Sequence, residues 1–319
     1  VTDVTLREHL APSRAPGRRI RARSWAPTQP TRDELPGGCR LSPSTRCSGA
    51  VCGGRQGRAR LPCGHAAVPR CAGPGRGDRP EYVQFRGPDA GFRASAAPVP
   101  GPTTAPFQAI ARRHGCWVLA GSVAEASGDP DRPYNTSALI DPGGEVVAAY
   151  RKLHLFDIAV DAGPADTESA RVTAGDAGVV AAVDEVRLGL SICYDLRFPE
   201  LYRALALAGA QVLAVPAVFT ERTGRDHWEV LLRARAIENA AFVIAPAQHG
   251  RGVPGGIPAF GRSMIVDPWG TVIAQAPDGE AIVVADLDLD RVGAVRRQIP
   301  SLANRRPDAL PPAREVRGS

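Results

Sequence analysis

The sequence predicts an α/β fold in which layered sheets are covered by helices. From about residue 81, short apolar runs alternate with amphipathic stretches, the order typical of a layered α/β protein. Several runs are almost continuously apolar, as strands buried on both faces are. An Asp-Pro-x-Gly turn also occurs twice, at 141–144 and 267–270, a separation of 126 residues. This repeat predicts two related halves, although the turn is a good hairpin former in any protein.

The elements expected up to residue 193 have local reasons in turn chemistry and periodicity. Gly115 ends the first helix, and the 141–144 turn joins two strands into a hairpin. In order, the sequence predicts a helix at 106–115, a strand at 116–122, hairpin strands at 136–140 and 145–150, and a strand pair at 179–183 and 187–193.

The second half repeats the alternation of strands and helices. Gly209 ends one helix, and Asp226 and Asp290 are N-cap residues for two others. In order, the sequence predicts a helix at 199–208, a strand at 211–215, a longer helix at 227–239, a strand at 241–245, a hairpin at 263–276, a strand at 281–287 and a last helix from about 290.

Residues 1–79 differ from the rest of the chain in composition. They contain 15 Arg against 5 Asp and Glu, a net charge of +10, whereas the remainder holds 24 Lys and Arg against 28 acids, a net charge of −4. With 9 Pro and 11 Gly, this segment predicts a basic disordered region, or an out-of-frame translation. Residues 80–310 predict one folded domain, and 311–319 a tail. Because this domain is mildly acidic, nucleic-acid binding is disfavoured.

No apolar run reaches the roughly 18–20 residues that cross a bilayer, and the N-terminus lacks the pattern of a signal peptide. We therefore expect a cytoplasmic protein with no membrane partner. Five of the seven cysteines lie within residues 1–79, at spacings that fit no zinc site. Their odd number argues against a disulfide framework.

Lys152 is the single lysine among 39 basic residues; the other 38 are arginines. Because arginine is used at every other basic position, the lysine indicates that this position needs a compact ammonium group.

Cys193 follows the apolar run 188–192 and precedes a helix, which predicts a cysteine at a strand-to-helix turn. A helix N-terminus there lowers the pKa of a thiol, and its N–H groups can stabilise an oxyanion. The alternative is a buried structural cysteine. A nucleophilic cysteine needs a base, and the residues leave two arrangements open: a carboxylate such as Glu81 acting with Lys152, or a histidine. The candidate histidines are His154, His227 and His249.

Three motifs carry a family resemblance: Tyr150-Arg-Lys-Leu-His-Leu-Phe156, Cys193-Tyr-Asp-Leu-Arg-Phe-Pro-Glu-Leu-Tyr-Arg203, and His227-Trp-Glu-Val-Leu-Leu-Arg-Ala-Arg-Ala-Ile-Glu238. They resemble the nitrilase, or carbon–nitrogen hydrolase, superfamily, in the branch that holds omega-amidase and deaminated glutathione amidase. The resemblance covers about 80–310 and implies a four-layer α-β-β-α sandwich. Because 1–79 show no strand pattern, we expect the first strands of that fold to be missing or replaced.

The resemblance also implies a Glu–Lys–Cys triad. Glu81 matches the base of the family, Lys152 the lysine, Cys193 the nucleophile and Glu168 a supporting glutamate. Lys152 and the backbone N–H of Tyr194 would hold the oxyanion. This chemistry requires no metal or organic cofactor.

The implied reaction is hydrolysis of the terminal carboxamide of a small acid by water, through a thioester, with release of ammonia. Arg197, Arg225 and His227 are candidates for binding that acid, and a homodimer is the expected assembly by analogy. The alternatives are an inactive nitrilase-like scaffold or binding protein, a nitrilase, and an N-carbamoyl amine hydrolase.

Overall fold

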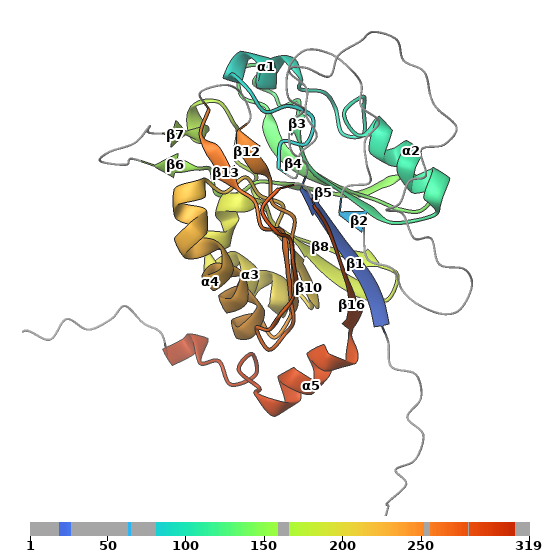
Figure 1. The fold of residues 1–319 in the computed structure, drawn as a ribbon, viewed down its shortest axis with the longest axis vertical. Coiled ribbons are helices and arrows are strands. Elements are labelled where there is room, and N and C mark those ends of the chain that lie inside the picture. Colours follow the sequence, from blue (N-terminus) through green and yellow to red (C-terminus); the bar gives the residue numbers. More distant parts are fainter. Residues whose placement is uncertain are drawn as a thin grey trace, which may run out of the picture.

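Two six-stranded sheets pack against each other between helices in the computed structural model (Figure 1). The structure describes residues 81–158, 166–251, 256–279 and 281–309, together with the backbone of two short strands before residue 81. The first sheet contains, in spatial order, β16 (Ala281–Asp288), β1 (Arg19–Ala26), β2 (Cys63–Gly64), β3 (Val118–Glu125), β4 (Tyr134–Ile140) and β5 (Val146–Arg151). The second contains β15 (Val272–Gln275), β14 (Met264–Val266), β11 (Phe242–Ala245), β10 (Val212–Ala214), β9 (Val186–Leu190) and β8 (Val179–Val183).

Helices and short elements complete the described fold. The α-helices are α1 (Asp89–Ala94), α2 (Ala105–His114), α3 (Pro199–Leu207), α4 (Glu221–Asn239) and α5 (Asp290–Gln298). Two small ladders pair β6 (Asp157–Ile158) with β7 (Asp166–Thr167), and β12 (His249–Arg251) with β13 (Pro258–Phe260). The 3₁₀ turns are η1 (Glu168–Ala170), η2 (Cys193–Arg197) and η3 (Pro307–Ala309).

The buried side chains show how the layers are stacked. Leu139 of the first sheet and Leu188 of the second belong to one buried cluster, which also takes in Trp228 of α4. The opposite face of the first sheet packs on α2, where Phe107 meets Ile140 in a separate cluster. The order is therefore helix, sheet, sheet, helix, and the α-β-β-α architecture expected from the sequence is confirmed (Figure 1).

The two sheets have the same internal order. In each, an antiparallel strand (β16 or β8) precedes three parallel strands (β1–β2–β3 or β9–β10–β11), and an antiparallel hairpin (β4–β5 or β14–β15) follows. The two Asp-Pro-x-Gly turns close these hairpins in the same way. Gly144 (φ 84°) and Gly270 (φ 86°) each donate an N–H to the carbonyl of the turn's aspartate at 2.9 Å. The shared strand order supports the interpretation of two related halves.

Residues 1–79 contribute two strands. Of the expectation that the first strands of the fold are missing or replaced, the first alternative is therefore wrong. Arg19–Ala26 pairs along its whole length with β16, and Cys63–Gly64 bridges β1 and β3. The sequence Arg-Ile-Arg-Ala-Arg-Ser-Trp-Ala has the period of 2 that strands require, but its frequent arginines give it the composition of a disordered segment. The prediction for the rest of 1–79, and for 311–319, lies outside the described residues.

Helix α4 begins six residues before the start expected from Asp226. It follows Thr220 and includes Gly224, a residue with poor helix propensity. A Cβ at Gly224 would lie 2.4 Å from the Cβ of Phe260, so close packing with β13 requires glycine within the first turns.

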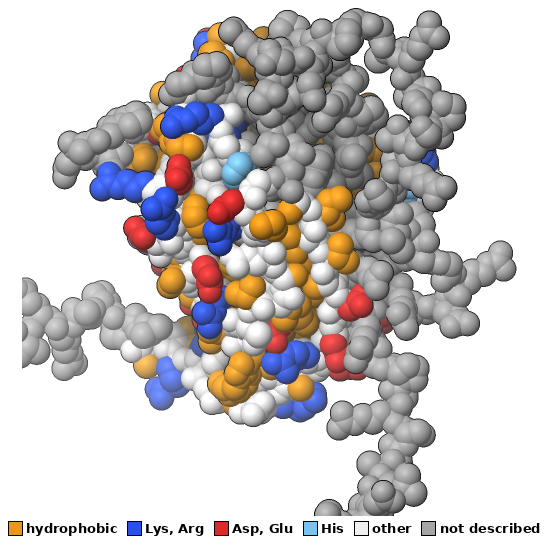
Figure 2. Space-filling view, viewed as in Figure 1, with side chains coloured by type: hydrophobic (Ala, Val, Ile, Leu, Met, Phe, Trp, Pro, Cys, Tyr) orange, Lys and Arg blue, Asp and Glu red, His pale blue; other side chains and the backbone are white. Residues whose placement is uncertain are grey.

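The outer face of α4 has mixed charge. Arg225 pairs with Glu221 at 3.2 Å and Arg233 with Glu229 at 3.4 Å, and Figure 2 shows basic and acidic side chains side by side over this helix. Within the described part of the chain, no helix has both the length and the apolar character needed to cross a membrane.

Truncating a side chain between the two sheets should destabilise the protein. Leu188 is 1% exposed in β9, so Leu188→Ala leaves a cavity and should lower the free energy of unfolding by about 2–5 kcal/mol. Val230 is 66% exposed on α4, and Val230→Ala should change it by less than about 0.5 kcal/mol. Urea unfolding of the three proteins measures both values, and equal effects of the two substitutions would contradict the layer assignment.

Candidate active site

Cys193 lies at the turn that leads from β9 into α3. It is the first residue of η2, its side chain is buried, and its φ of 48° lies in the left-handed region. A non-glycine residue in this region is strained by about 1–3 kcal/mol and persists where the surroundings impose it. Its N–H donates to the carbonyl of Pro216 at 2.9 Å, which holds the turn against the end of β10. The strand-to-helix turn expected from the sequence is present.

Lys152 follows β5 and is 1% exposed. Its backbone N–H donates to the carbonyl of Asn135 in β4 at 2.9 Å, so the position of Lys152 is set by the sheet. Its Nζ lies 2.9 Å from Oε1 of Glu81 and 2.8 Å from Oε2 of Glu168. The single lysine of the chain therefore joins two buried carboxylates.

Glu81 has a partner at each carboxylate oxygen. Oε1 accepts from Lys152 and from Nδ2 of Asn135 at 3.2 Å, and Oε2 accepts from the N–H of Val218 at 2.8 Å. Its backbone carbonyl accepts from the side chain of Gln248. Both halves of the chain thus hold Glu81 in place.

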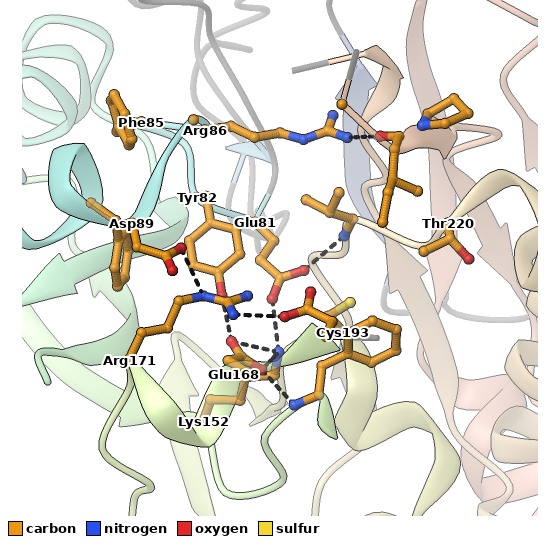
Figure 3. Close-up of a pocket in the computed structure, with 18 residues that line it drawn as sticks. Glu81, Tyr82, Phe85, Arg86, Asp89, Lys152, Glu168, Arg171, Cys193 and Thr220 are labelled. Carbon is orange, nitrogen blue, oxygen red and sulfur yellow. Dashed lines mark hydrogen bonds and ion pairs between the residues drawn. The ribbon is translucent and has the colours of Figure 1, made fainter. Parts of the chain in front are cut away.

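Glu168 begins η1 and is buried. Besides Lys152, its carboxylate accepts from the hydroxyl of Tyr82 and from the N–H of Phe156 at 2.6 Å (Figure 3). It also accepts from Nδ2 of Asn135 at 3.4 Å. This set of donors favours the ionised carboxylate over the protonated acid.

The charges of the site set the protonation of its members. Burial alone would lower the pKa of Lys152, but attraction to Glu168 and Glu81 raises it well above its usual value. Burial alone would raise the pKa of Glu168, but the ammonium and hydrogen bonds of Lys152 lower it. Burial raises the pKa of the Cys193 thiol, and the charge of Glu81 raises it further, while Lys152 lowers it. These shifts favour a charged ammonium on Lys152, an ionised carboxylate on Glu168 and a protonated thiol on Cys193.

These residues open into one cavity of about 260 Å³, a size suited to a small molecule. Glu81, Lys152, Glu168 and Cys193 lie in its wall, and the labelled side chains of Figure 3 surround it. The remaining lining residues are Tyr82, Phe85, Arg86, Gly87, Asp89, Phe92, Phe156, Asp166, Arg171, Val218, Thr220, Gly256, Ile257 and Pro258.

Of the other residues expected at the site, some lie beside the cavity and others lie on the surface of α4. Tyr194 and Arg197 line a narrow recess that shares Cys193 with the main cavity. His227 is exposed on α4, with its Nδ1 3.2 Å from a guanidinium nitrogen of Arg197. The structure does not bring Arg225 to either hollow: its side chain is 71% exposed and pairs with Glu221.

Reasoning from the sequence missed three residues that line the cavity, Tyr82, Arg86 and Arg171. It also missed Asn135, which donates to both glutamates. Asn135 had a signal, because it is a polar residue at a strand position followed by buried neighbours. Tyr82 is adjacent to Glu81 in the chain. Arg86 and Arg171 had no signal in the sequence, because nothing local distinguishes them from the other 36 arginines. Only the fold brings them to the wall of the cavity.

The fold and the site together define an α-β-β-α sandwich protein whose buried Glu–Lys–Glu cluster shares a cavity with a cysteine. The family model for carbon–nitrogen hydrolases matches residues 68–297, compared with 80–310 expected from the sequence. The chain belongs to the carbon–nitrogen hydrolase family, of the nitrilase superfamily, and the resemblance seen in its motifs is confirmed.

Relatives and solved structures give the same family. The deaminated glutathione amidase of Synechocystis is 44% identical over 229 residues, 71% of this chain and 84% of that protein. The human omega-amidase NIT2 is 39% identical over 217 residues, 68% of this chain and 78% of that protein. The crystal structure of the C. elegans NitFhit protein superposes with a TM-score of 0.67 at 38% identity, covering 73% of this chain and 57% of that one.

Removing the ammonium from the cluster should make stability depend on pH. In the wild type, Lys152 lowers the folded-state pKa of Glu168, so the stabilisation is present above the ordinary value of 4.5 and is lost as pH falls below it. In Lys152→Met, burial dominates and raises that pKa, so the variant loses stability as pH rises above 4.5. The difference in unfolding free energy should therefore grow from pH 4 to pH 7 and reach about 3–5 kcal/mol.

The matched control is Arg225→Met. Arg225 pairs with Glu221 at 3.2 Å, and both side chains are exposed (71% and 49%), so its loss should lower stability by less than about 1 kcal/mol. Urea unfolding at several pH values gives all these quantities. A Lys152→Met effect that stays constant from pH 4 to pH 7 would show that the ammonium does not stabilise the two carboxylates.

Proposed function

We propose that this protein is an amidase that hydrolyses the terminal carboxamide of a small acid and releases ammonia, with Cys193 as nucleophile. The observation that carries the proposal is the shared cavity, in which a protonated thiol lies beside a carboxylate held by a buried ammonium. A thiol with a raised pKa needs a base at the moment of attack, and Glu81 forms a hydrogen bond with it.

In the first half of the reaction, Glu81 takes the proton of the Cys193 thiol as sulfur attacks the amide carbon. The charge that develops on the carbonyl oxygen is stabilised by the ammonium of Lys152 and by the N–H of Tyr194. The C–N bond then breaks, and the nitrogen leaves as ammonia with the proton returned by Glu81. The acyl group remains on Cys193 as a thioester.

In the second half, Glu81 takes a proton from water as the water oxygen attacks the thioester carbon. The C–S bond breaks, the thiol regains its proton, and the product is a carboxylic acid. The net reaction adds one water to one amide. Glu168 acts on neither substrate; it keeps Lys152 charged and oriented toward Glu81.

The substrate class follows from the relatives and from the cavity. The relatives are named deaminated glutathione amidase and omega-amidase, and both names denote amidases. We infer that the substrate is the monoamide of a 2-oxo-dicarboxylic acid or deaminated glutathione. Arg197 in the recess beside Cys193 remains our candidate for contact with the acid, and His227 for support of Arg197. A homodimer and a cytoplasmic location remain predictions.

The scaffold alternative rested on the absence of opening strands within 1–79. Strands β1 and β2 remove part of that reason, because they fill positions between β16 and β3. A nitrilase or an N-carbamoyl amine hydrolase remains as an outcome of the assay below.

Ammonia release over a panel of omega-amides, nitriles and N-carbamoyl amines tests the reaction. We expect turnover of the amides, and Cys193→Ala should lower the rate by at least about 1,000-fold because the nucleophile is gone. Cys116 is also buried, but it packs between α2 and the first sheet, so Cys116→Ala should retain activity. Turnover of nitriles or carbamoyl compounds alone would contradict the amidase proposal. With no ammonia release and no selective alkylation of Cys193, the scaffold alternative would replace it.

The thioester can be intercepted by a second nucleophile. Hydroxylamine added during turnover should divert part of the acyl product to a hydroxamate, because both nucleophiles compete for the same acyl-enzyme. Glu81→Gln should lower both ammonia and hydroxamate formation by about 100- to 10,000-fold, since one base serves both halves. Direct attack of water on the amide, without an acyl-enzyme, predicts no hydroxamate in the wild type.

A further inference from the structure

Asp195 is a fully buried carboxylate that the reaction above does not use. It lies in η2, two residues after Cys193, and accepts four hydrogen bonds. Oδ1 accepts from the backbone N–H of His154 at 3.0 Å and from its Nδ1 at 2.7 Å. Oδ2 accepts from the hydroxyl of Tyr150 at 2.7 Å and from the N–H of Ile192 at 2.8 Å.

The partners of Asp195 flank the two reactive side chains. Tyr150 and His154 lie two residues before and two residues after Lys152, and Ile192 directly precedes Cys193. A single carboxylate therefore joins the segment that carries the ammonium to the turn that carries the thiol.

A ring contact joins the same two segments. His154 stacks on Phe198 with ring centroids 3.7 Å apart and planes 7° from parallel, and Phe198 directly follows η2. The N–H of Leu153 donates to the hydroxyl of Tyr150 at 3.3 Å, so the 150–154 segment is also held by a hydrogen bond within itself.

We propose that Asp195 is the positioning residue that fixes the ammonium of Lys152 relative to the sulfur of Cys193. The inference rests on the proposed function for its effect on turnover, but its geometric content concerns only the two segments.

The four donors explain why this position holds a carboxylate. An ionised Asp accepts at both oxygens, whereas the amide of Asp195→Asn offers one acceptor oxygen and one NH₂ group of nearly the same size. In that variant, the N–H of either Ile192 or His154 loses its acceptor. The segment beside Cys193 or the segment beside Lys152 is then released, while the volume of the core is preserved.

A change in the distance between the ammonium of Lys152 and the thiol of Cys193 should change the pKa of the thiol. Lys152 lowers the pKa of Cys193 against the opposing effect of burial. If Lys152 moves away, the thiol pKa rises, and the pH midpoint for alkylation of Cys193 moves upward with it. A loss of global stability alone would not shift this midpoint in the folded protein.

The test compares Asp195→Asn with the wild type in the full chain. Because misplacement of about 1 Å lowers rates by about 100-fold, kcat should fall by about 10- to 100-fold, with KM changed by less than about threefold. The pH midpoint of iodoacetamide labelling, read by mass spectrometry on the peptide that contains Cys193, should move upward. The control is Asp141→Asn, a carboxylate that accepts a backbone N–H in the β4–β5 turn, which should change neither quantity.

Two further variants keep the proposal testable if Asp195→Asn fails to fold. Tyr150→Phe and His154→Phe each remove one donor and keep the ring, so each should shift the labelling midpoint in the same direction by a smaller amount. Folded variants with unchanged kcat and an unchanged midpoint would overturn the proposal. If the wild type hydrolyses no amide but the midpoint still shifts, the positioning role holds and the proposed function fails.

Discussion

The attraction between one buried ammonium and two buried carboxylates is the constraint on which this molecule depends. Lys152 without its partners would be an unpaired charge in the core, and each glutamate without Lys152 would be one as well. The sequence places these groups on three separate segments, so burying any one of the charges is favourable only where all three segments meet. The fold holds each of the three groups in place. The carbonyl of Asn135 in β4 fixes the backbone of Lys152, the N–H of Val218 after β10 binds Glu81, and Glu168 is the first residue of η1.

Hydrogen bonds from the surrounding backbone extend that constraint outward. The N–H groups of Val218 and Phe156 replace the water that the carboxylates lose on burial, so two loops are fixed by the charges they solvate. The turn at Cys193 is held in a similar way, through its own N–H and through the carboxylate of Asp195. The sulfur of Cys193 thus lies beside charged and hydrogen-bonding groups that are fixed by the fold.

Much of this arrangement could be predicted from the chain. The single lysine, the cysteine after an apolar strand and the repeated hairpin turns have local signals. In the structure Lys152 and Cys193 line one cavity, and the two turns close hairpins. Strand β1 was missed because composition was weighed above alternation. Arg86 and Arg171 were missed because pairing between distant segments creates their surroundings, and no local pattern encodes it. Arg225 was overestimated because its neighbours along the helix resemble a motif, while its side chain turns to solvent.

The two halves of the chain contribute different residues to the site. Glu81, Lys152 and Glu168 come from the half that contains β3, β4 and β5, whereas Cys193 and the N–H of Val218 come from the half that contains β8, β9 and β10. Neither half alone contains both Glu81 and Cys193. Any chemistry that needs both Glu81 and Cys193 therefore requires the two halves to be packed together.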